Sequence, residues 1–127
     1  MVTLSCLRRI SSWQTRLLST AMVGIASARF WPHYDQYRAE RQKIGDRRVR
    51  LITDFLAQKN SMSEDEARSL AKEDFAIEKD TSELKAKWYE KMTKVLSERT
   101  VARFFHIDGK LDAAADLALA ANIPLIH

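Results

Sequence analysis

Residues 63–95, SEDEARSLAKEDFAIEKDTSELKAKWYEKMTKV, decide the fold class of this chain. Apolar residues recur there at spacings of seven, seven, four, four and three, which is typical of a helix with one apolar side. They are Leu70, Ile77, Leu84, Trp88, Met92 and Val95. Ser63 and Glu66 fit a capping box, in which the hydroxyl and the carboxylate each bind a backbone N–H of the first turn. The stretch predicts a helix from Glu64 to about Val95.

Helices are also predicted on both sides of this stretch. The first is expected over about 35–59, with apolar residues at helical spacing. These residues are Tyr37, Ile44, Leu51, Ile52, Phe55 and Leu56. Gly45 falls inside this helix and marks either a weak point or the close approach of another backbone.

The third helix is expected to begin after Ser97, its N-cap, and to run to about Ala121. Pro124 ends it, because a proline disfavours helical geometry at the residue before it. Alanines near its end would let a neighbouring helix pack closely. Its expected inner face carries Val101, Phe104, Phe105, Leu111, Ala115 and Ala118.

The chain has only three glycines and two prolines, and no proline occurs between His33 and Ile123. A protein built of β-sheets needs turn residues at short intervals, and this chain has too few of them. We therefore expect long helices. We expect an all-α fold in which three helices pack as an elongated antiparallel hairpin or bundle. A helix of about 32 residues spans about 48 Å. Such a shape leaves apolar surface that a homodimer would cover.

Residues 1–28 have the pattern of a secretory signal peptide. Arg8, Arg9 and Arg16 form a positive region, residues 17–25 (LLSTAMVGI) form a short apolar region, and residues 26–28 (ASA) form a cleavage site. The apolar run is about half the length needed to span a membrane, so an uncleaved anchor is the weaker alternative, as is a first core helix. The sequence predicts a periplasmic protein whose residues 29–127 form one helical domain without a membrane anchor.

The composition changes once this leader is set aside. The leader holds three of the 21 basic residues and none of the 17 acidic ones, so residues 29–127 have a formal net charge of +1. The basic isoelectric point therefore belongs mostly to the leader, and we expect no nucleic-acid partner. The single cysteine, Cys6, also lies in the leader. Residues 29–127 show no phosphate-binding loop, cysteine nucleophile or serine elbow, so neither an enzyme nor a cofactor is expected.

Opposite charges gather on the first two predicted helices. Residues 38–50 have a net charge of +4 and residues 64–80 have a net charge of −4. If these helices are antiparallel, the simplest interpretation is pairing between them within the chain. The alternative is that the basic face attracts client polypeptides. The candidate contact residues are then Tyr34, Tyr37, Arg41, Arg47 and Arg48.

Four aromatic residues follow the predicted leader, ahead of and within the first predicted helix: Phe30, Trp31, Tyr34 and Tyr37. Such residues most often form core contacts. Because aromatic rings beside cations form adaptable recognition surfaces, a client-binding patch is the alternative.

The three histidines, His33, His106 and His127, have no i, i+4 pairing of the kind that helical metal sites use. We therefore assign no metal site. A metal-responsive sensor that uses His106 and neighbouring carboxylates remains the alternative function, with Asp108, Asp112 and Asp116 as the nearby carboxylates.

Residues 62–66 (MSEDE) and 96–100 (LSERT) stand at the two predicted turns, each with an apolar residue followed by a hydroxyl residue. With its leader and long helices, the chain resembles the small periplasmic helical-hairpin proteins of the Spy/CpxP type, whose turns carry a Leu-Thr-x-x-Gln motif. Here Glu66 and Thr100 stand in place of the glutamine. Residues 96–125 resemble the C-terminal helix of uncharacterised exported bacterial proteins related to that group.

This resemblance implies a holding-chaperone or envelope-stress role. Together with the residues above, it leads us to expect a protein that binds unfolded or partner polypeptides by reversible hydrophobic and electrostatic contact. No nucleotide is needed for such binding.

Overall fold

The computed structural model describes residues 29–124, and it folds them into three helices. They are α2 (Phe30–Gln58), α3 (Glu64–Thr93) and α4 (Glu98–Ala120). No strand occurs within these described residues. The predicted all-α fold is confirmed. The predicted leader and the last residues, 125–127, lie outside the described part of the chain.

Helix α2 begins at Phe30, five residues before the predicted start at Asp35. Pro32 lies within the first turn of α2. Backbone N–H groups in a first turn have no helical carbonyl four residues earlier to bind, so the N–H that proline lacks costs the helix no hydrogen bond. The earlier start makes the aromatic cluster helical. As a result, Phe30, Tyr34 and Tyr37 lie on one side of α2 at spacings of four and three, and all three are buried.

The starts of α3 and α4 follow the sequence prediction. The Glu66 amide donates to Ser63 Oγ at 3.1 Å and the Ser63 amide donates to Glu66 Oε2 at 2.9 Å, which completes the predicted capping box. Ser97 caps α4, since its Oγ accepts from the Thr100 amide at 3.2 Å. Both helices therefore begin where local hydrogen bonding dictates.

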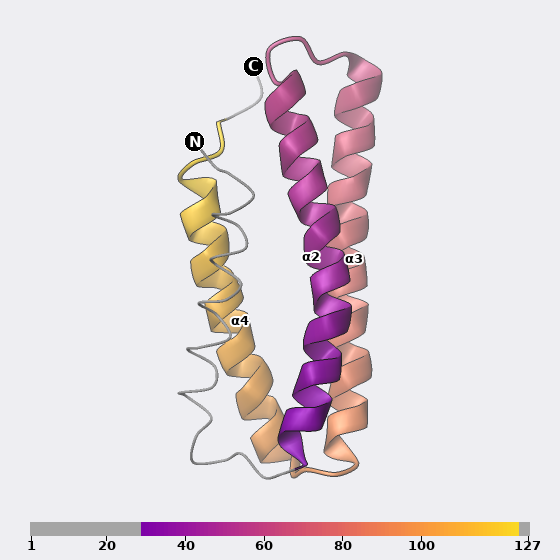
Figure 1. The fold of residues 1–127 in the computed structure, drawn as a ribbon, viewed down its shortest axis with the longest axis vertical. Coiled ribbons are helices and arrows are strands. Elements are labelled where there is room, and N and C mark those ends of the chain that lie inside the picture. Colours follow the sequence, from indigo (N-terminus) through magenta and orange to yellow (C-terminus); the bar gives the residue numbers. More distant parts are fainter. Residues whose placement is uncertain (1–28, 125–127) are drawn as a thin grey trace.

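The helices alternate in direction, and their common core lies at one end of the molecule (Figure 1). There the start of α2, the end of α3 and the start of α4 meet. The aromatic core, as we call it, consists of Phe30, Tyr34, Tyr37, Trp88, Met92, Val101 and Phe104. The Phe104 ring contacts the rings of Phe30 and Tyr37 edge to face, at centroid distances of 5.3 and 5.7 Å. Burial of these large rings is the main source of stability at this end.

The other end is less completely packed. Helices α2 and α3 stay side by side, whereas α4 diverges from them towards its C-terminus (Figure 1). Ile77 is the buried residue of α3 in this half, while Phe75 is 67% exposed. Within residues 29–124, no helix has the length and apolar character needed to cross a membrane.

Two details of the predicted packing are wrong. Val95 lies beyond the end of α3 in the turn to α4, and Ala118 is exposed because α4 has moved away from its neighbours by that point. For Gly45 the sequence left two interpretations open, and the structure excludes the close approach of another backbone, because no atom from outside its own helical turn lies within 4 Å of a Cβ built there.

Candidate functional site

A buried polar network links the three helices just beyond the aromatic core. Asp108 of α4 is 5% exposed, and its Oδ2 accepts a hydrogen bond from the Tyr37 hydroxyl of α2 at 2.8 Å. Arg41, one turn further along α2, donates to the Tyr37 hydroxyl oxygen at 2.9 Å and to Asp112 Oδ2 at 2.7 Å. Lys85 of α3 completes the set, with its Nζ 3.0 Å from the same Asp112 oxygen. We call these five residues the central network.

Burial and neighbouring charge set the ionisation of this network. Burial, and then the charge of Asp112, raise the pKa of Asp108 above its ordinary value despite the bond from Tyr37 and the nearby Arg41. Burial also acts on Asp112, but the charges and hydrogen bonds of Arg41 and Lys85 outweigh it and lower the pKa of that carboxyl. Burial and the neighbouring Asp108 raise the pKa of the Tyr37 hydroxyl. Asp112 is therefore the firmly ionised carboxylate of the pair.

This chemistry suits a structural role for the central network. Its carboxylates are held by Arg41, Lys85 and the Tyr37 hydroxyl, and each of the three helices contributes at least one member. A buried charge left without its partner is costly, so only one register of α4 against α2 and α3 satisfies every group. The network thereby fixes where α4 lies in the bundle.

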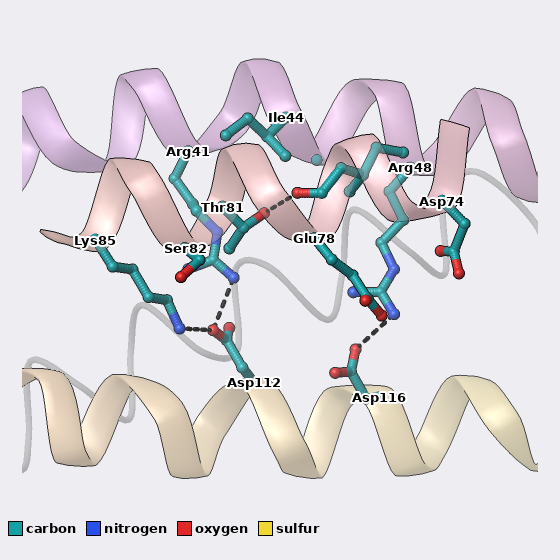
Figure 2. Close-up of a pocket in the computed structure, with 12 residues that line it drawn as sticks. Arg41, Ile44, Arg48, Asp74, Glu78, Thr81, Ser82, Lys85, Asp112 and Asp116 are labelled. Atoms are coloured by element: carbon teal, nitrogen blue, oxygen red, sulfur yellow. Dashed lines mark hydrogen bonds and ion pairs between the residues drawn. The ribbon is translucent and has the colours of Figure 1, made fainter. Parts of the chain in front are cut away.

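A groove of about 370 Å³ opens next to the central network, between α2, α3 and the diverging α4. Figure 2 shows Arg41 and Lys85 converging on Asp112 at one end, and Arg48 reaching Asp116 at the other. The Arg48 Nη2 to Asp116 Oδ1 distance is 3.0 Å, and both side chains are about half exposed. The groove combines charges of both signs with apolar surface, and its size is within the range of small ligand sites.

Two of the five predicted contact residues, Arg41 and Arg48, line this groove. Arg47 instead points to α3, where its guanidinium binds Glu73 Oε1 at 3.0 Å and Asp80 Oδ2 at 2.5 Å. The hydrogen bonds that Arg47 donates to Asp80 and Glu73 raise its pKa. Pairing between the basic part of α2 and the acidic part of α3 is thus confirmed for Arg47.

The other two predicted contact residues, Tyr34 and Tyr37, are 4% and 0% exposed. In this fold their rings belong to the aromatic core, which is the commoner role that the sequence left open for them. The helical start at Phe30 is the physical reason, because it turns both rings towards Phe104. Neither ring offers a surface to a client.

Beside the aromatic core, the Trp88 indole N–H donates to the Glu40 carboxylate, which also accepts from Lys87 Nζ at 3.0 Å. These two hydrogen bonds lower the pKa of the Glu40 carboxyl, and the bond from Trp88 has the larger effect. The Lys91 ammonium lies 4.6 Å from the Trp88 ring centre, a cation–π contact. This cluster ties α2 to α3 at the edge of the core.

The structure gives the histidines no shared site. His106 is exposed on α4, and the His33 ring nitrogen Nδ1 lies 2.9 Å from the Arg29 carbonyl oxygen. His127 lies outside the described residues. Within residues 29–124, no three histidine, cysteine or acidic side chains come together as a metal site would require. The carboxylates near His106 are engaged with arginine and lysine instead.

The pairing of the aspartates of α4 with basic residues of α2 and α3 was not predicted from the sequence. Asp108, Asp112 and Asp116 recur every four residues on α4, and Arg41 and Arg48 are seven residues apart on α2. Both spacings keep the charges on one helix face. This pattern was a readable signal of pairing between α2 and α4. Lys85 carried no comparable signal.

Comparison with known proteins adds no relative: no protein-family model, no curated protein and no solved structure matches this chain. The resemblance to the Spy/CpxP type therefore stays a prediction.

Proposed function

We propose that this protein is an exported, all-helical protein that binds other polypeptides, as a chaperone-like or envelope-stress accessory that uses no nucleotide or cofactor. The observation that carries the proposal is the groove between α2, α3 and α4. It lies between the three helices, and its lining joins Ile44 and Ile77 to charged groups of both signs.

Such a groove suits a segment of polypeptide better than a compact charged ligand. Ile44 supplies apolar surface, while Asp74 and Glu78 have no ion-pair partner within residues 29–124 and can receive basic side chains. Phe75 is 67% exposed and lies one turn before the groove residue Glu78 on α3, so its apolar side chain borders the groove. Hydrophobic contact with mixed charge gives reversible binding of moderate specificity.

The predicted contact residues take different parts in this proposal. Arg41 and Arg48 contribute their charge to the groove. The Tyr37 hydroxyl accepts a hydrogen bond from Arg41 and so holds that guanidinium in place. Tyr34 supports the same helix from within the core. Arg47 joins α2 to α3 and has no contact role here.

Export to the periplasm is part of the proposal and depends on the leader pattern in residues 1–28. Mass spectrometry of the protein purified from cells tests it directly. A mature chain that begins at Arg29 supports export, and a chain that retains residues 1–28 contradicts it.

The test of binding is the aggregation of reduced, unfolded α-lactalbumin, followed by light scattering. The protein is added at stoichiometric amounts, without nucleotide and with metal chelated. We expect it to suppress the scattering. Absence of suppression by protein that circular dichroism shows to be helical would overturn the proposed function.

Two variants locate the contact. Phe75→Ser should weaken suppression, because it removes an exposed apolar side chain next to the groove. Val95→Ser is the matched control, since Val95 is also exposed but lies in the α3–α4 turn at the opposite end. An equal effect of both variants would show that the groove is not the binding surface.

A further inference from the structure

The C-terminal half of α4 exposes an outer side that carries no charge. Residues 113–124 contain one charged side chain, Asp116, and that side chain pairs with Arg48 across the groove. Leu117 is 74% exposed, more than Phe75 or Val95. A helix at a protein surface ordinarily carries polar residues on its outer side. An apolar helix side that is exposed, with Leu117 at its centre, therefore indicates a surface that binds another molecule.

The exposed residues form one continuous line along α4. His106, Lys110, Ala113, Leu117 and Ala120 follow one another at spacings of four, three, four and three, which keeps them on a single face, and all five are exposed. The line is polar up to Lys110 and apolar from Ala113 onward. We call it the outer face of α4.

We propose that the outer face of α4 binds the same face of a second copy of this chain, in an antiparallel contact centred on Leu117. A two-fold axis at that residue sets position 110 of one copy opposite position 124 of the other, and 113 opposite 121. The short side chains on either side of Leu117 let the two helices approach closely. The two leucines then bury each other at the centre.

Charge complementarity favours a second copy as the occupant. Helix α4 has no basic residue in its last turn, so the negative end of its dipole lacks a compensating charge. Lys110 has no ion-pair partner among the described residues. The antiparallel contact places each Lys110 ammonium beside the last turn of the other α4, where a cation is stabilising. Asp116 points to the groove instead and adds no repulsion.

This contact is independent of polypeptide binding, because Leu117 lies on the side of α4 opposite the buried Ala115 and away from the groove. Sedimentation velocity of the full chain over a range of micromolar concentrations tests it. We expect a dimer whose dissociation constant rises more than about tenfold in Leu117→Glu. Phe75→Glu is the matched control, since it places the same charge at an exposed apolar position on α3, and it should stay dimeric.

Cysteine cross-linking tests the two-fold geometry. In a Cys6→Ser background, Leu117→Cys should form a disulfide-linked dimer on mild oxidation, because the two-fold axis places the sulfur atoms of the two copies opposite each other. Ala102→Cys, exposed on the other half of α4, should not. A monomeric wild-type chain, a dimer unaffected by Leu117→Glu, or equal cross-linking at both positions would overturn the proposal.

Discussion

Removal of a single oxygen atom tests the central network. Tyr37→Phe keeps the ring that packs on Phe104 but deletes the hydroxyl that donates to Asp108 at 2.8 Å and accepts from Arg41 at 2.9 Å. The residue is 0% exposed, so water cannot replace the lost partner. Asp108 would remain buried without its closest donor.

The expected cost follows from the kind of bond that is lost. A hydrogen bond to a charged group contributes about 1.5–3 kcal/mol, and a buried group left unsatisfied costs about 1–3 kcal/mol. We therefore expect Tyr37→Phe to lower the free energy of unfolding by about 2 kcal/mol. For a domain of this size, that corresponds to a fall in Tm on the order of 10 °C.

Urea unfolding followed by far-ultraviolet circular dichroism and by tryptophan fluorescence measures this change. Tyr89→Phe is the matched control, because Tyr89 is half-buried against Phe105 and its hydroxyl has no hydrogen bond within the described residues. It should change stability by less than about 0.5 kcal/mol. Equal stabilities of the two variants would refute a stabilising role for the network. In an Asp108→Asn background, Tyr37→Phe should cost less than in the wild type, because the two residues are coupled.

Two further predictions concern stability. Gly45→Ala and Gly109→Ala should each raise the free energy of unfolding by about 0.5–1 kcal/mol, because glycine is a poor helix former; an added Cβ meets no atom within 4 Å at either position, and a loss of stability in urea unfolding would contradict this. Asp108→Asn should gain stability relative to the wild type as pH rises above about 4, the ordinary pKa of an aspartate, because the raised pKa of Asp108 means that its ionisation costs the native state free energy. Urea unfolding of both proteins across this pH range measures the difference, and a difference that is flat or falls with pH would contradict the assignment.

The sequence by itself determined the three helices and the starts of α3 and α4. Spacing of apolar residues, the Ser63–Glu66 capping box and the Ser97 cap are local features, and the backbone hydrogen bonds that they satisfy lie within a few residues. The predicted start of α2 was five residues late, because the apolar spacing was followed only from Tyr37, whereas the first turn of a helix tolerates Pro32.

Only the tertiary structure decided what the charged and aromatic residues do. Tyr37 lies 71 positions from Asp108 along the chain, as Arg41 does from Asp112, and no local rule specifies which face of one helix meets which face of another. The divergence of α4 likewise depends on packing against two other helices. It opens the groove and leaves Ala118 exposed, because the large rings that hold the bundle together all lie at the opposite end.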